Sequence, residues 1–155
     1  MQRVTVEFVL NGEKRKVDVM PTDILLEVLR EKLGIKSPKY GCGRGDCGTC
    51  TIILNGKTVR ACLILAVEVD GQEIVTLEGL PEEKMKPLWD SFLEHSSFQC
   101  GFCTPGMIMS VYELLEKKNE VSEEDVKEAL SGNLCRCTGY TPIIEAVVEA
   151  ARNYR

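Results

Sequence analysis

Hydrophobic and polar residues alternate along the first part of the chain. Apolar residues occupy every second position before Asn11-Gly12, and the alternation resumes at Val17 and Val19; the first set is Val4, Val6, Phe8 and Leu10. Alternation with a period of two predicts β-strands, and Asn-Gly is a strong signal for a two-residue hairpin turn. A second Asn-Gly pair, Asn55-Gly56, separates TIIL from KTV. The pattern therefore predicts two hairpins, with a further short strand over residues 73–77.

A helical pattern lies between the two hairpins. Five apolar residues recur at spacings of three and four; they are Ile24, Leu25, Val28, Leu29 and Leu33. This spacing predicts a helix over residues 24–33, with Thr22 or Asp23 as its N-cap and Gly34 as its end. Strands around one helix, with a long Gly- and Cys-rich loop over residues 40–50, predict a small α+β domain.

The pattern changes to helices in the second part of the chain. Apolar residues recur at helical spacing in four segments: Leu88, Trp89, Phe92 and Leu93; Met107, Ile108, Val111, Leu114 and Leu115; Val126, Ala129 and Leu130; and Ile143, Ile144, Val147, Val148 and Ala151. Ser122 and Asp125 have the spacing of a capping box. Four short helices with one apolar face each predict a small bundle. Glycine, proline and charged residues cluster over residues 79–86, so we place two domains at residues 1–79 and 80–155.

Composition and charge exclude several classes of function. The net charge of −5 over 155 residues argues against a nucleic-acid-binding surface, which needs a clustered basic face. No apolar run approaches the roughly 20 residues that span a bilayer. No Walker loop, dinucleotide fingerprint or Ser-His-Asp set is present, so we expect this chain alone to bind neither nucleotide nor flavin. No signal peptide precedes the first strand-like segment, and we expect a cytoplasmic protein.

Eight cysteines are the unusual feature of the composition, and they fall into two groups of four. In a reducing compartment, closely spaced cysteines more often bind metal or carry out redox chemistry than form disulfides. His95 is the single histidine, which excludes an iron–sulfur centre with two histidine ligands from this chain alone. We expect His95 at a helix end or on the surface, and Trp89 in the core.

The first cysteine group has the spacing C-x4-C-x2-C-x11-C and begins within GCGRGDCGTC; its members are Cys42, Cys47, Cys50 and Cys62. The first three spacings are those of a plant-type [2Fe–2S] ferredoxin loop. Glycines between the cysteines permit positive φ and let backbone N–H groups approach the sulfur atoms. A structural zinc site is the alternative, but zinc ligands usually come as two C-x₂₋₄-C pairs rather than as three and one.

The second cysteine group consists of two close pairs, Cys100-x2-Cys103 and Cys135-x-Cys137. Each pair is followed by threonine, a Gly/Pro turn and an apolar helix, with Pro105 and Pro142 where the first helical turn begins. A helix N-terminus favours thiolate over thiol. Taken alone, the residues of this group are compatible with either a zinc site or an iron–sulfur cluster.

Three motifs in this order, GCGRGDCGTC, FQCGFCTPG and GNLCRCTGY, resemble the iron–sulfur subunit of the molybdenum hydroxylases, the xanthine dehydrogenase, aldehyde oxidoreductase and carbon monoxide dehydrogenase family. The resemblance covers nearly the whole chain. It implies an N-terminal β-grasp ferredoxin-like domain followed by a C-terminal four-helix bundle, each with one [2Fe–2S] cluster. It also implies the ligands: Cys42, Cys47, Cys50 and Cys62 for the distal cluster, and Cys100, Cys103, Cys135 and Cys137 for the proximal one.

The same resemblance implies cofactors and partners outside this chain. A large partner subunit would bind molybdopterin and oxidise the substrate, and Gln99 and Cys137 match positions that lie at the pterin. Electrons would pass from molybdenum through the proximal and then the distal cluster to an FAD-binding medium subunit or an external acceptor. The implied assembly is a hetero-oligomer, and this chain would be its electron-transfer subunit with no substrate site.

Two other functions remain open from the sequence: a free-standing two-cluster ferredoxin, and a zinc-stapled interaction module without redox activity. Arg44 departs from the family pattern, which usually has an acidic residue there, and its positive charge is expected to raise the potential of the distal cluster. Arg136 lies between two ligands of the proximal cluster, and we expect it to contact the partner subunit rather than to tune the potential.

Overall fold

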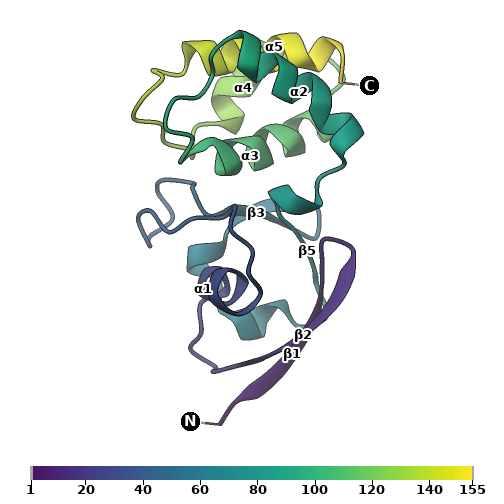
Figure 1. Cartoon of the computed structure of the whole chain (residues 1–155), viewed down its shortest axis with the longest axis vertical. Helices are drawn as coiled ribbons and strands as arrows, with labels where there is room; N and C mark the ends of the chain where they lie inside the picture. Colours follow the sequence, from purple (N-terminus) through teal and green to yellow (C-terminus); the bar gives the residue numbers. More distant parts are fainter. Residues whose placement is uncertain (1, 155) are drawn as a thin grey trace.

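A computed structural model describes residues 2–154 and places a sheet in one half of the molecule and most of the helices in the other (Figure 1). The strands are β1 (Val4–Leu10), β2 (Glu13–Val19), β3 (Thr51–Leu54), β4 (Lys57–Arg60) and β5 (Glu73–Val75). The α-helices are α1 (Leu25–Glu27), α2 (Glu82–Glu94), α3 (Thr104–Lys117), α4 (Glu123–Ala129) and α5 (Thr141–Arg152). The prediction of a sheet followed by four helices is therefore confirmed.

The five strands form one mixed sheet in the order β2-β1-β5-β3-β4. Strand β1 pairs parallel with β5, and the other pairs are antiparallel. Both predicted hairpins are present, and the turn residues Asn11-Gly12 and Asn55-Gly56 all have positive φ, as a type I′ turn requires. Strand β5 is shorter than the predicted 73–77, because residues 77–79 form a 3₁₀ turn that leads toward the helical half.

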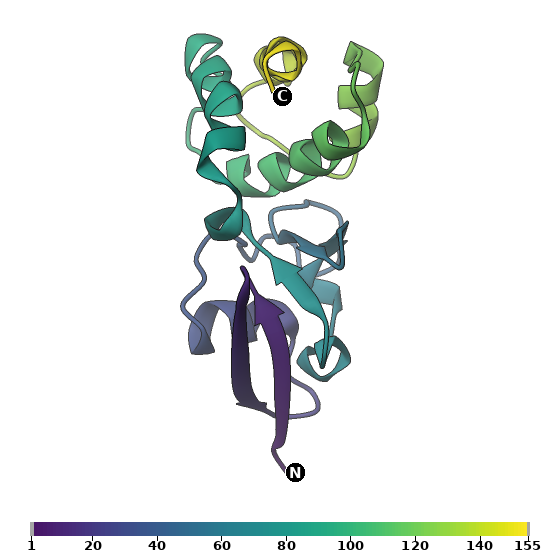
Figure 2. The ribbon, with the colours of Figure 1, turned by 90° about the vertical axis from the view of Figure 1, so that its right-hand side faces the viewer.

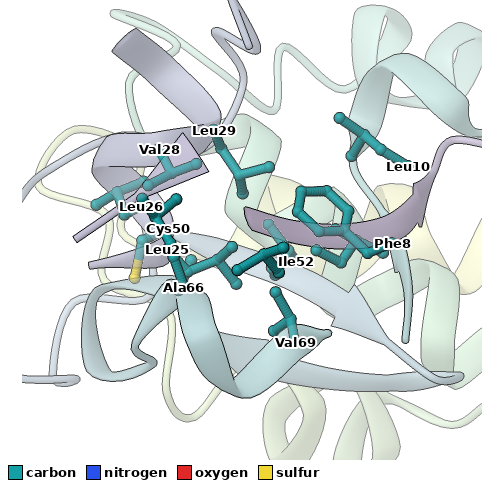
Figure 3. Close-up of a cluster of buried hydrophobic side chains, with 14 of the residues drawn as sticks. Phe8, Leu10, Leu25, Leu26, Val28, Leu29, Cys50, Ile52, Ala66 and Val69 are labelled. Atoms are coloured by element: carbon teal, nitrogen blue, oxygen red, sulfur yellow. The ribbon is translucent and has the colours of Figure 1, made fainter. Parts of the chain in front are cut away.

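One face of the sheet packs against the helix that follows β2. Helix α1 continues into a π-helical turn over Val28–Lys32, and the two together correspond to the predicted helix 24–33. The predicted N-cap at Thr22 or Asp23 is wrong: Ile24 precedes the first turn, and Asp23 instead accepts hydrogen bonds from the Met20 amide and from Lys32. Figure 3 shows this core, with Phe8 and Leu10 toward one end and Cys50 beside the leucines of the helix at the other.

The four later helices enclose a second hydrophobic core. Helix α5 contacts α2 and α4, and α3 contacts α4. The capping box at Ser122 and Asp125 is confirmed, as are the proline residues Pro105 and Pro142 in the first turns of α3 and α5. Trp89 packs partly buried against this core. The two cores share no residue.

The two halves meet where α3 lies against β3, β4 and the loop that carries the first cysteines (Figures 1 and 2). Glu113 on α3 accepts hydrogen bonds from the amide and the hydroxyl of Thr58, and Arg60 donates to the carbonyl oxygen of Gly132 at 2.8 Å. A Cβ atom on Gly106 would lie 2.2 Å from the carbonyl oxygen of Gly48, so the backbones are in direct contact there. This close contact fixes the position of the first cysteine loop relative to α3.

Within residues 2–154, none of the helices has the length and apolar character needed to cross a membrane.

The single histidine lies at the end of α2, as the sequence predicts, and its contact with α5 should make the stability of the fold depend on pH. His95 Nε2 lies 2.5 Å from Glu149 on α5, and this hydrogen bond raises the pKa of His95 above its ordinary 6.5. Because its pKa is raised in the folded state, protonated His95 stabilises the fold at pH values below 6.5. This contribution is lost as the pH rises through the folded-state pKa. We expect His95→Gln to lower the free energy of unfolding by less than about 1 kcal/mol under mildly acidic conditions and not at all under alkaline ones.

Urea unfolding at several pH values measures this effect. Glu124→Gln, on the far helix α4, is a matched control that leaves the contact between α2 and α5 intact. An equal loss for His95→Gln at all pH values would contradict the prediction.

Candidate metal centres

The first cysteine group is gathered by the β3–β4 hairpin and the loop before it. Cys50 directly precedes β3 and Cys62 follows β4, so the antiparallel pairing brings these two buried residues together. Cys42 and Cys47 lie half-buried in the preceding loop. Cys42 and Cys47 lie beside each other, since the Cys47 amide donates to Cys42 Sγ at 3.4 Å, and Cys50 and Cys62 lie beside each other at the ends of the hairpin. The structure thus brings together all four residues that the spacing singled out.

Backbone N–H groups surround the sulfur of Cys42. The amides of Arg44 and Cys47 donate to Cys42 Sγ at 3.5 and 3.4 Å, and they lower the pKa of this thiol to about 6. The loop passes close to the sulfurs: a Cβ atom on Gly41 would lie 2.7 Å from Cys47 Sγ. A side chain at position 41 would therefore displace this sulfur, and the predicted positive φ of the loop glycines is confirmed at Gly43, Gly45 and Gly48.

The second cysteine group lies where α3 and α5 begin. Cys103 is the N-cap of α3, and Cys135 and Cys137 lie in the loop before α5. Sγ of Cys137 lies 3.5 Å from Sγ of Cys100, and both residues are exposed. The thiols of Cys103 and Cys135 form a second, half-buried pair, and Thr138 donates a hydrogen bond to Cys135 Sγ at 3.1 Å. This group therefore has an outer pair and an inner pair.

The positive end of a helix does not by itself favour the thiolate in the inner pair. Burial, together with the hydrogen bond to Cys135, raises the pKa of Cys103 to about 12. Burial also opposes ionisation of Cys135, but hydrogen bonds from Thr138, Cys137 and Cys103 together outweigh it and lower the pKa of Cys135. Burial likewise raises the pKa of Cys50 in the first group to about 11. Buried thiols of this kind become thiolates readily only when a bound metal supplies the compensating positive charge.

The donor sets fit [2Fe–2S] clusters. Thiolate ligands select soft metals, chiefly zinc, copper(I) and iron–sulfur clusters. In neither group do three of the described Cys, His, Asp or Glu side chains converge on one ion position; the thiols form two pairs in each group. Two pairs are what a cluster of two irons requires, because each iron takes two protein ligands.

Comparison with known proteins agrees with these two centres. Residues 8–78 match the family described as "2Fe-2S iron-sulfur cluster binding domain", and residues 76–148 match the family described as "[2Fe-2S] binding domain". The small FeS subunit of nicotinate dehydrogenase from Eubacterium barkeri is 47% identical over 148 residues, which are 95% of this chain and 94% of that subunit. The small subunit of nicotine 6-hydroxylase from Paenarthrobacter nicotinovorans is also 47% identical, over 96% of this chain and 90% of that one.

Solved structures give the same result. A chain of quinoline 2-oxidoreductase from Pseudomonas putida 86 superposes with a TM-score of 0.90 at 44% identity, over 99% of this chain and 98% of that chain. The chain belongs to the iron–sulfur subunits of the molybdenum hydroxylases. The aldehyde oxidoreductase of Desulfovibrio desulfuricans gives a TM-score of 0.89 at 42% identity, and there the matched region is only 17% of a longer chain. The iron–sulfur subunit is thus the electron-transfer component of an oxidoreductase, as the sequence predicted.

The two residues expected at the pterin lie next to each other in the iron–sulfur subunit. Gln99 and Cys137 are both exposed, and Gln99 Nε2 donates to the carbonyl oxygen of Cys137 at 3.1 Å. The side chain of Gln99 is therefore tied to the loop that carries the outer cysteine pair. Their contact with a pterin stays a prediction.

Sequence reasoning missed a cation near the second group. Lys39, from the sheet half, lies with Nζ 5.5 Å from the centre of the Phe102 ring, next to Cys103. Burial lowers the pKa of Lys39, and the nearby Cys103 and Cys100 thiols oppose that shift. No sequence signal could have found it, because 63 positions separate Lys39 from Phe102 and only the packing of the two halves brings them together.

The structure changes the expectation for Arg44. Its guanidinium lies 2.6 Å from the carboxylate of Asp46, and both side chains are exposed, so much of its charge is offset beside the first cysteine group. We expect Arg44→Glu to lower the reduction potential of that centre, because two negative charges then face an anionic site. Asp46→Asn should raise the same potential, because it leaves Arg44 unopposed.

An EPR-monitored redox titration of the assembled complex measures both shifts. The potential of the second centre is the internal comparison and should shift less in both variants, since Arg44 and Asp46 lie in the first cysteine loop and exposed charges are screened over about 10 Å. Equal first-centre potentials in the wild type and in Arg44→Glu would contradict the prediction.

Proposed function

We propose that each cysteine group of the iron–sulfur subunit holds one [2Fe–2S] cluster. Cys42, Cys47, Cys50 and Cys62 form the first site, and Cys100, Cys103, Cys135 and Cys137 form the second. The arrangement of each group as two thiol pairs is the observation that carries this assignment. A [2Fe–2S] cluster accepts and releases one electron at a time; the residues of this chain hold it, exclude water from its inner side and supply hydrogen bonds to its sulfur ligands.

The proposed domain organisation follows from the two cores. Residues 1–79 would be a β-grasp ferredoxin-like domain, since a mixed sheet with one helix across it surrounds the first site. Residues 80–155 would be a four-helix bundle around the second core, with the second site at the start of α3 and α5. The matches to two [2Fe–2S] families divide at nearly the same place, at residues 76–78.

A direct contact joins the two sites. The amide of Leu134, which precedes Cys135, donates to the carbonyl oxygen of Cys47 at 2.9 Å. Cys47 of the first site is thereby connected to Cys135 of the second site through this hydrogen bond and the backbone of Leu134. This connection supports electron exchange within the subunit, as opposed to two independent centres.

The second site would face a large molybdopterin-binding partner. Its outer thiols are exposed, and Phe98, Phe102 and Leu134 around them expose 37%, 45% and 54% of their surface. Exposed apolar side chains grouped around a redox site are typical of a surface that another subunit covers. Gln99 and Cys137 would contact the pterin there. A flavin-binding subunit or an external acceptor would take electrons from the first site, in a hetero-oligomer.

The names of the relatives support this assignment. Two of them are named as the small subunits of a nicotinate dehydrogenase and of a nicotine 6-hydroxylase. The substrate of the present complex would be oxidised entirely in the large partner, because this chain would supply electron transfer alone. A free-standing ferredoxin fits less well, since it would leave the apolar rim of the second site uncovered.

Metal analysis and EPR of the purified subunit, or of its complex, test the cluster assignment. We expect about four irons per chain and two distinct signals in the reduced state. Cys50→Ser should remove or alter the first signal only, and Cys103→Ser the second only. A colourless protein with about two zinc ions per chain would overturn the proposal in favour of a zinc-stapled interaction module.

Arg136 provides a test of the partner surface. It is exposed beside Cys135 and Cys137, and no hydrogen bond or ion pair within residues 2–154 engages its side chain. We expect Arg136→Ala to weaken binding to the large subunit by roughly 1 kcal/mol or more, because the guanidinium would lose a partner across the interface. The potential of the second centre should shift little.

Size-exclusion chromatography and titration calorimetry of the reconstituted complex measure the affinity. Arg15→Ala, on the exposed strand β2 of the sheet half, is the matched control and should bind as the wild type does. Unchanged affinity together with a clear change in the second-centre potential would assign Arg136 to electrostatic tuning.

A further inference from the structure

Asn133 is a fully buried amide at the contact between the two halves. Only 2% of its surface is exposed, and it directly precedes Leu134 and Cys135 of the second site. Its Nδ2 donates to the carbonyl oxygen of Gly48 at 3.2 Å and lies 3.4 Å from the hydroxyl of Thr51. Its Oδ1 accepts a hydrogen bond from Ser110 on α3 at 2.8 Å. One side chain thus bonds to the first cysteine loop, to β3 and to α3.

The residues that Asn133 joins are immediate neighbours of the proposed cluster ligands. Gly48 follows Cys47, and Leu134, which follows Asn133, donates to the carbonyl oxygen of Cys47 at 2.9 Å. The Asn133 side chain therefore holds the carbonyl group of Gly48, and the Leu134 amide holds the neighbouring carbonyl group of Cys47. A sliding movement of one cysteine loop past the other would break both hydrogen bonds together.

The backbones at this contact are as close as glycine allows. A Cβ atom on Gly48 would lie 2.3 Å from the carbonyl oxygen of Gly132 and 2.6 Å from Asn133 Nδ2. Arg60 donates to the same Gly132 carbonyl and to Thr51, so the polar groups around Asn133 are paired. Every buried side-chain N or O atom among the described residues has a hydrogen-bond partner.

The backbone of Asn133 is held from the other side by Tyr140. The Tyr140 hydroxyl donates to the carbonyl oxygen of Asn133 at 3.1 Å and accepts from the amide of Cys135 at 2.9 Å. Tyr140 has φ of 72°, a left-handed conformation that is strained for a bulky residue, and it directly precedes α5. The two hydrogen bonds of its hydroxyl tie the loop that contains Asn133 and Cys135 to the start of α5.

We propose that Asn133 is a positioning residue that sets the separation of the two redox centres and thereby the rate of electron exchange between them. The inference rests on the proposed function, since it presupposes a cluster at each cysteine group. Electron exchange falls steeply with distance, and a neutral amide fixes the distance without adding charge beside either anionic centre. Its effect is exerted through Gly48 and Cys47 on one side and through Leu134 and Cys135 on the other.

The test uses Asn133→Leu and Asn133→Asp in the purified, cluster-loaded complex. Leucine keeps the approximate volume but has neither donor nor acceptor, and aspartate keeps the acceptor for Ser110 but loses the donor to Gly48. EPR of the fully reduced protein measures the magnetic splitting between the two centres, which depends on their separation. Rapid photoreduction measures the rate of exchange between them.

We expect both variants to retain iron, to show a smaller or broadened splitting, and to slow the exchange several-fold. Asn119→Leu and Asn119→Asp, at an exposed site after α3, are the matched controls and should behave as the wild type. Ser110→Ala keeps the Gly48 hydrogen bond and frees only Oδ1, so it should give an intermediate effect. Should Asn133→Leu lose the second cluster, the splitting in Asn133→Asp and Ser110→Ala decides the question, because the splitting depends on the separation of the centres and not on their potentials.

Loaded variants with unchanged splitting and an unchanged exchange rate would overturn the inference, even if their stability is lowered. A purely structural Asn133 would give this result, because it would change the free energy of unfolding but not the magnetic coupling. Failure of the proposed function is a different outcome: the wild type itself would then lack two iron–sulfur signals.

Discussion

The contact of residues 47–49 with residues 132–135 is the constraint on which the rest of the structure depends. Each cysteine loop is built by its own half: β3 fixes the first through Cys50, and α5 fixes the second through Tyr140. The first loop can touch the second loop and α3 only because Gly48 and Gly106 lack side chains, since a Cβ atom on either would lie within 2.3 Å of a carbonyl oxygen. A side chain at either position would therefore push the two halves of the molecule apart at this surface.

The protonation behaviour of the thiols follows from the same arrangement. Each group combines an outer thiol whose pKa is lowered by backbone donors, Cys42 or Cys100, with an inner thiol whose pKa burial raises to about 11 or 12, Cys50 or Cys103. The inner thiols are unfavourable as isolated anions, so the cost of burying them as thiolates would be offset by the positive charge of a bound metal. Folding of these loops and loading of the centres are therefore coupled.

Local features of this chain could be predicted from the sequence, and contacts between its halves could not. The Asn-Gly hairpins, the capping box at Ser122 and the division of the cysteines into two groups all depend on residues close together in the chain, where turn chemistry and ligand spacing decide the outcome. The pairing of Arg44 with Asp46 lies within the same loop, but its side-chain geometry left no sequence signal. The contact of Lys39 with Phe102 and the hydrogen bond from Asn133 to Gly48 depend on how one half docks on the other. Their partners are 63 and 85 positions apart in the sequence.

The chemistry of Asn133 explains why an amide occupies this position. The site requires a donor toward Gly48 and an acceptor for Ser110 at the same time, in a place where solvent is excluded. Aspartate has no donor when ionised, and lysine or arginine has no acceptor. A buried charge would also cost desolvation and shift the potentials of both neighbouring centres, because electrostatic interactions are strong at low dielectric. A neutral group with both functions holds the two loops together and leaves the tuning of the centres to backbone N–H groups and to charges at the surface.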